Sequence, residues 1–113
     1  MKIAGLLLIA ILLAACAPNY LYYGNVSQRH YQYVKSPDPV SRQEYKHSLE
    51  KVFAKSEQYK LPVPPGLYCD YALLLATEGD YAAAREYFLK EKAQWAESSR
   101  FIDFLLARYG LQD

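Results

Sequence analysis

The chain has 113 residues, with 13 lysines and arginines against 12 aspartates and glutamates. This length fits one small domain with a short tether. The balanced charge lacks the basic excess that holds phosphates, so we expect no nucleic-acid partner.

The first segment is an apolar run with one basic residue before it. Lys2 precedes residues 3–13, which contain no charged side chain, and this pattern is typical of a secretory signal. The run is shorter than the roughly 20 apolar residues that span a bilayer. A buried N-terminal helix is the alternative, but the small residues and the cysteine that end the run favour the signal.

Residues 13–16, Leu-Ala-Ala-Cys, resemble the lipobox at which bacterial lipoprotein signal peptidase cleaves. The resemblance implies that residues 1–15 are removed as a lipoprotein signal peptide. The mature chain then begins at Cys16, whose thiol takes a diacylglycerol through a thioether. The acyl chains carried by this cysteine, such as palmitate, anchor the protein to a membrane. Ala17 stands where an aspartate resembles an inner-membrane retention signal, so we expect an outer-membrane anchor that faces the periplasm.

Acylation of Cys16 leaves Cys69 without a partner in the chain. One interpretation is a redox-active thiol or a disulfide between chains in an oxidising compartment. The other is a small buried side chain on a helix. The apolar stretch around Cys69 favours the second interpretation.

Residues 16–40 predict a tyrosine-rich lead segment behind the anchor. Pro18, Gly24 and Asn25 disfavour regular structure, and residues 26–35 suit a short helix only weakly. Tyrosine has a large apolar face with a polar tip, which suits protein interfaces and stacking against sugars. We expect these tyrosines either to contact a partner or the membrane interface, or to fold back as a packed strap across the helices. The residues are Tyr20, Tyr22, Tyr23, Tyr31 and Tyr33.

Residues 41–113 predict a helical domain. Ser41 and Glu44 match a capping box at the start of a helix over 41–59, and the prolines of 61–65 end that helix. The nearly all-apolar residues 66–77 predict a second helix that is largely buried.

Two more helices follow, over 81 to about 95 and from 98 or 99 to 109, where Gly110 ends the chain's last helix. In this last helix Phe101, Phe104, Leu105 and Arg108 recur at helical spacing. No stretch alternates like a strand, so the sequence predicts an all-α bundle of about three to four helices behind the signal.

The segment 68–88 resembles one tetratricopeptide repeat, with a generic helical hairpin as the alternative. A glycine-aspartate turn joins two helices, and small residues let them approach closely. Glu91 and Ala96 depart from the pattern, which usually has a small residue and a proline there. About one and a half repeats imply a small adaptor rather than a long peptide-binding groove. The residues that carry this resemblance are Tyr68, Ala72, Gly79, Asp80, Tyr81, Ala84 and Phe88.

The chain after the lipobox also resembles a family of small bacterial lipoproteins, domain of unknown function 4810. The similar segments are 22–25, 31–33, 63–68, 79–81 and 96–98. A tryptophan is common in that family where Tyr23 stands. No activity is known for the family. Its members tend to be encoded beside lipoproteins similar to the curli secretion channel, which implies an envelope protein as partner.

The titratable residues do not form a recognisable catalytic pattern. His30 and His47 lie on different expected segments and form no helical metal pair. Asp70, Glu78 and Asp80 lie near the expected hairpin, but Asp80 already serves as a helix cap. We therefore expect no enzyme, no cofactor and no metal.

The leading hypothesis is a non-catalytic adaptor or accessory subunit of an envelope complex, lipid-anchored in the outer membrane. The alternative is a cell-wall glycan-binding module that uses exposed tyrosines. An enzyme acting on envelope polymer ranks last.

Overall fold

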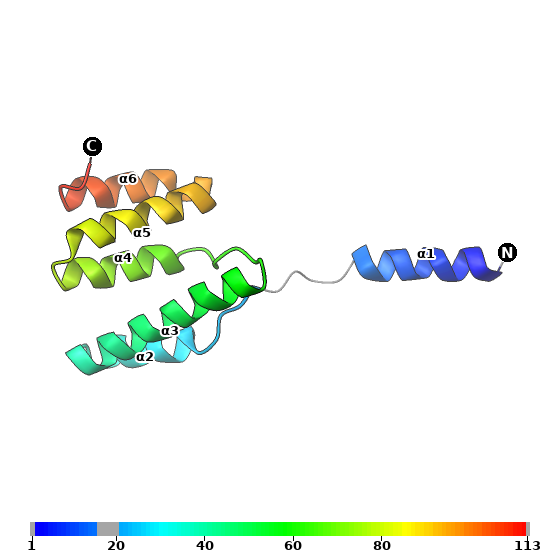
Figure 1. Cartoon of the computed structure of the whole chain (residues 1–113), viewed down its shortest axis with the longest axis horizontal. Coiled ribbons are helices and arrows are strands. Elements are labelled where there is room, and N and C mark those ends of the chain that lie inside the picture. Colours follow the sequence, from blue (N-terminus) through cyan, green and yellow to red (C-terminus); the bar gives the residue numbers. More distant parts are fainter. Residues whose placement is uncertain (1, 16–20, 113) are drawn as a thin grey trace.

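The computed structural model describes residues 2–15 and 21–112, and the regular structure in them is helical (Figure 1). The all-α prediction is therefore confirmed. Five α-helices follow residue 20, more than the three to four expected, because residues 26–35 form a complete helix. The elements are α1 (Lys2–Ala15), α2 (Val26–Lys35), α3 (Pro39–Gln58), α4 (Leu67–Thr77), α5 (Tyr81–Gln94), the 3₁₀ turn η1 (Ala96–Ser98) and α6 (Ser99–Arg108).

Helix α1 lies apart from the other helices in Figure 1. Large apolar side chains such as Ile3, Leu6 and Leu8 are exposed along it. Among the described residues, no helix combines the length and apolar character needed to cross a membrane. Cleavage after residue 15 stays a prediction, and Cys16 lies outside the described residues.

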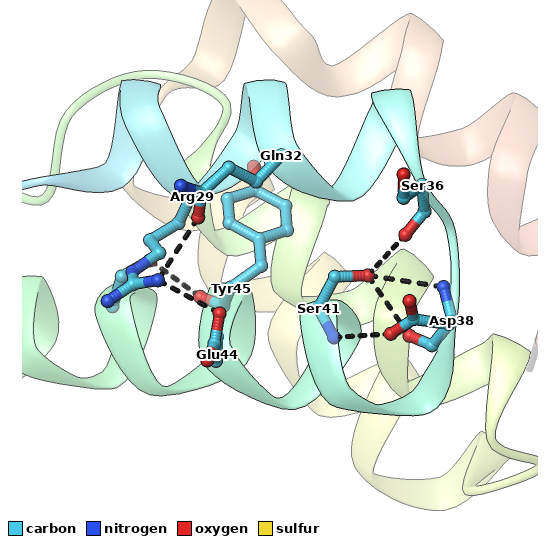
Figure 2. A network of polar contacts seen from close by, with 8 residues as sticks. Arg29, Gln32, Ser36, Asp38, Ser41, Glu44 and Tyr45 are labelled. Atoms are coloured by element: carbon cyan, nitrogen blue, oxygen red, sulfur yellow. Dashed lines mark hydrogen bonds and ion pairs between the residues drawn. The ribbon is translucent and has the colours of Figure 1, made fainter.

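Helix α3 begins two residues earlier than predicted, with Asp38 as its N-cap. Asp38 Oδ1 accepts a hydrogen bond from the Ser41 N–H at 2.8 Å, and Ser41 Oγ accepts one from the Asp38 N–H at 3.1 Å (Figure 2). Pro39 suits the first helical position, where no N–H partner is needed. The predicted box between Ser41 and Glu44 is therefore wrong, because Ser41 already closes one with Asp38.

Helices α4 and α5 form the antiparallel hairpin that the sequence predicts (Figure 1). Ala72 and Ala84 are fully buried, as expected where small residues let two helices approach. Gly79 turns the chain at φ +83°, a conformation that is strained for other residues. Asp80 then caps α5 by accepting a hydrogen bond from the Ala83 N–H at 3.3 Å.

Helix α6 packs against α5 through Ile102, Leu105 and Leu106. Phe101 and Phe104 are 56% and 58% exposed, so of the residues expected at helical spacing in this helix only Leu105 is buried. Both rows of residues have helical spacing, and packing against α5 selects the row of Ile102. The terminating role of Gly110 is confirmed, since the helix ends at Arg108 and Gly110 has φ +67°.

The core runs through the bundle from α2 to α6. Its largest fully buried side chains include Phe88 of α5, Leu49 of α3 and Ile102 of α6. Helix α2 contributes Val26, and Tyr33 packs against the same core. The lead segment therefore continues into a helix that belongs to the bundle.

Candidate functional site

The structure separates the tyrosines that the sequence singled out for partner binding. Tyr20 lies outside the described residues. Tyr22 and Tyr33 are half-buried against the core, which is the position expected for side chains of a packed strap. Tyr23 and Tyr31 are 50% and 65% exposed, so they are accessible to a partner. Partner binding by these tyrosines stays a prediction.

A partly buried polar contact joins α3 to α4 beside α2. Tyr45 Oη donates a hydrogen bond to Asp70 Oδ2 at 2.8 Å, and the His30 ring lies edge-on to the Tyr45 ring at 5.3 Å. Burial raises the pKa of Asp70, against the lowering effects of the Tyr45 hydrogen bond and the His30 charge. A small cavity of about 150 Å³ lies beside this contact. Both residues line this cavity, and the hydrogen bond to Asp70 fixes the position of the Tyr45 side chain.

The other acids near the hairpin have separate structural partners. Glu78 pairs with Lys46 at 2.8 Å and with Arg42 at 3.4 Å, which ties the end of α4 to α3. Asp80 caps α5. Asp70 lies in the first turn of α4 and Glu78 follows its last residue, so the three acids do not converge on one site.

Glu91 is a buried acid whose role the sequence analysis missed. Its side chain is on α5, only 2% exposed, and its Oε1 accepts a hydrogen bond from the Gly66 N–H at the start of α4. Gly66 has no side chain with which to cap α4, so Glu91 supplies the carboxylate from the neighbouring helix. This contact explains why a small residue is absent at position 91.

The second carboxylate oxygen of Glu91 has no hydrogen-bond partner among the described residues. Burial raises the pKa of Glu91, and the Gly66 N–H acts in the opposite direction. Burial therefore makes ionisation of this carboxyl less favourable than it is in water. No sequence pattern marks it, because Gly66 and Glu91 lie 25 residues apart.

Cys69 is a free, buried thiol on α4. Burial, followed by the negative charge of Asp70, raises its pKa to about 12. A thiol with such a pKa is protonated at neutral pH and is a poor nucleophile. The structure agrees with the interpretation of Cys69 as a small buried side chain.

Four aromatic rings form a cluster between α3, α4 and α5. The Tyr71 and Tyr87 ring centroids lie 4.6 Å apart, and those of Phe53 and Tyr68 lie 4.8 Å apart. Tyr71 is buried, whereas Tyr68 and Tyr87 are half-buried.

The edge of this cluster borders a cavity of about 470 Å³, which we name the aromatic groove. Lys90 Nζ lies 4.5 Å from the Tyr87 ring centroid and covers part of that ring. Ser56, 1% exposed, lines the groove, and its Oγ has no partner among the described residues. The groove therefore combines ring edges with polar groups from Glu50, Glu57, Lys90 and Gln94.

The outer surface of α6 has a different character. Phe101 and Phe104 lie three residues apart and are more than half exposed. Arg100 and Arg108 are exposed on the same side of the helix, and neither guanidinium group has a hydrogen bond or ion pair with another described residue. We name these four residues the α6 outer face. Phenylalanine has no polar side-chain atom, so two such rings side by side make this face a candidate contact surface.

A family model described as "Domain of unknown function (DUF4810)" matches residues 20–105. No curated protein and no solved structure matches the chain. The matched span contains the aromatic groove together with Phe101 and Phe104, and it ends before Arg108.

Proposed function

The chain belongs to the family described as domain of unknown function DUF4810, and from this premise we propose that it is a lipid-anchored adaptor of the bacterial cell envelope. It binds a partner protein and catalyses no reaction. The lipobox-like residues 13–16 support anchoring through Cys16, in the outer membrane on its periplasmic side. A lipoprotein similar to the curli secretion channel is the class of partner that the family resemblance suggests.

The observation that carries this proposal is the exposure of Phe101 and Phe104. Two phenylalanines in contact with water lose the favourable free energy that burial would provide. A 10-residue helix that also buries Ile102, Leu105 and Leu106 is apolar on more than one side. Helices of this kind are typical of positions between two packed elements. A protein partner on the free side completes that environment.

The engaged acids support a non-catalytic role. Asp70 is bonded to Tyr45, Glu78 to two basic residues of α3, and Glu91 to the backbone of Gly66. Each of these carboxylates stabilises a helix end or a helix contact. The small α4–α5 hairpin, which resembles a tetratricopeptide repeat, then acts as the rigid support of the binding surface.

Photo-crosslinking in intact bacterial cells tests the adaptor role. A photoreactive amino acid replaces Phe104 in the full chain, and a matched variant carries it at Ala82, which is exposed on α5. We expect one defined envelope protein to be crosslinked from position 104 and not from position 82. Equal crosslinking from both positions, or none from either, would contradict the proposal.

Mass spectrometry of the purified N-terminus tests the anchor independently. We expect a mature chain that starts at an acylated Cys16. A chain that keeps Met1, or an unmodified Cys16, would reject the lipoprotein part of the proposal. The adaptor surface on α6 does not depend on that result.

A glycan-binding module is the second candidate function, and the aromatic groove favours it. Tyr68 and Tyr87 present half-buried rings beside a cavity of about 470 Å³ with polar groups at its rim, which is a combination suited to a sugar ring. Co-sedimentation with purified peptidoglycan tests this function. Binding that is lost in Tyr87→Ala and kept in Tyr31→Ala would favour the groove over the adaptor surface.

A further inference from the structure

Helices α3, α4, α5 and α6 lie side by side in chain order, and α6 is the last of them (Figure 1). In stacked helical arrays the terminal element needs a polar outer face to stay soluble. Helix α6 presents Phe101 and Phe104 there instead, 56% and 58% exposed. Its outer face therefore resembles an internal contact of the stack rather than a cap.

The charges on this face define what can cover it. Arg100 and Arg108 flank Phe104 at four residues on either side, so the three side chains lie in a row along the helix. Neither arginine has a partner within the described residues. By contrast, the acidic residue of α6, Asp103, is already paired with Lys92 of α5 at 2.7 Å. The face offers two unpaired positive charges around an apolar centre.

We propose that the α6 outer face binds an acidic amphipathic helix of another protein, which extends the stack by one helix. This inference rests on the proposed adaptor function and names the chemistry of its partner. The apolar side of the bound helix covers Phe101 and Phe104. Its carboxylates, about two turns apart, pair with Arg100 and Arg108, whose guanidinium groups suit carboxylates well.

A second copy of this chain does not fit the same face. Two α6 helices in contact would bring Arg100 and Arg108 against their own copies. Helix α2, at the other end of the bundle, carries Lys35 and no acidic residue, and its Arg29 is paired with Glu44 of α3. Both modes of self-association would place like charges together, which opposes binding.

A membrane surface is also less well matched. Helices that bind anionic lipid have a polar face rich in lysine and arginine. The exposed acidic residues Glu97 and Asp103 flank Arg100 at three residues on either side in the sequence. These carboxylates would repel anionic headgroups, whereas a protein helix can place its own charges to avoid them.

Charge reversal combined with crosslinking from position 104 tests this inference in the full chain. The variant Arg100→Glu/Arg108→Glu keeps both phenylalanines, and Lys51→Glu reverses an exposed charge on α3 as the control. We expect the double reversal to lower the yield of crosslinked partner by at least about ten-fold, and the control to leave it nearly unchanged. Thermal melting of each variant shows whether the bundle is intact.

Mapping the crosslinked peptide by mass spectrometry decides the nature of the partner. A crosslink within an acidic helical segment, lost on charge reversal, supports the inference. A crosslink that survives charge reversal, or one that lies in a neutral or basic segment, overturns the acidic helix but leaves the adaptor function intact. Crosslinking only to a second copy of the chain overturns the inference as well. Crosslinking only to lipid, or the absence of any protein product, overturns both proposals.

Discussion

The two helical hairpins of the bundle are held together in different ways. In α4–α5, Ala72, Ala84 and Phe88 are fully buried, so apolar packing joins the helices. In α2–α3, α2 contributes Val26 to the core, and the partly exposed pair Arg29–Glu44 supports the contact at 2.9 Å (Figure 2). We infer that most of the packing free energy lies in the second hairpin, because burial of apolar area outweighs exposed polar contacts.

The largest expected effect tests this difference directly. Phe88→Ala should lower the free energy of unfolding by about 3–5 kcal/mol, because it removes a fully buried ring from α5. Tyr33→Ala in the first hairpin removes a half-buried ring that stacks on Tyr45 at 6.0 Å, and it should have a smaller effect. Urea unfolding followed by circular dichroism measures both. Equal losses would show that the two hairpins contribute alike.

The close approach of α4 and α5 gives the second prediction. Ala84→Phe should destabilise the protein by about 1–3 kcal/mol, since a fully buried position has no room for a ring. Ala82→Phe is the matched control, because Ala82 is exposed on the same helix. If thermal melting shows a neutral Ala84→Phe, the helices do not depend on small residues at this contact.

The same comparison shows what could be predicted from sequence. The turn of α4–α5 was predictable because its determinants are local: Gly79 must turn the chain, and Asp80 caps the residues that follow it. The start of α3 was not predicted correctly, because Ser41 has cap chemistry with either Asp38 or Glu44. Only the backbone geometry selects Asp38.

The candidate surfaces were harder to predict, because they depend on contacts between helices. Ile102 and Phe101 are neighbours of similar hydrophobicity, and packing against α5 buries the first while leaving the second exposed. The capping of α4 by Glu91 joins residues far apart in the chain. Tyr33 is half-buried because α2 folds against α3. The weak helical pattern of residues 26–35 did not predict that packing.

The third prediction concerns pH and the buried carboxyl of the second hairpin. Burial raises the pKa of Glu91 above its ordinary value of 4.5, so its contribution to stability is present below that pH. It is lost as the pH rises through the higher pKa of the folded protein. Glu91→Gln keeps an acceptor for the Gly66 N–H and removes the charge. As the pH rises from 4.5 through the raised pKa of Glu91, the free energy of unfolding of the wild-type protein should fall relative to that of Glu91→Gln.

Asp38, the N-cap of α3 in the first hairpin, has the opposite dependence of stability on pH. The hydrogen bond from the Ser41 N–H lowers the pKa of Asp38, so its stabilising effect is present above pH 3.8 and disappears as the pH falls. Asp38→Asn should therefore reduce stability near neutral pH and converge with wild type in acid. Melting temperatures as a function of pH measure both variants. Parallel curves for wild type and Glu91→Gln would show that Glu91 titrates as it does in the unfolded chain.

The smallest expected effect belongs to the ion pair Arg29–Glu44 between α2 and α3. Its side chains are 34% and 47% exposed, so water and salt screen their attraction. A double-mutant cycle with Arg29→Ala and Glu44→Ala should give a coupling of about 0.2–1 kcal/mol, decreasing at high salt. Lys92–Asp103 joins α5 to α6 with similar exposure, and serves as the reference pair. If the Arg29–Glu44 coupling were much larger than the reference and independent of salt, polar contacts would anchor α2 as firmly as packing anchors α5. The two hairpins would then differ in the kind of contact that holds their helices together, and no longer in how strongly those contacts stabilise them.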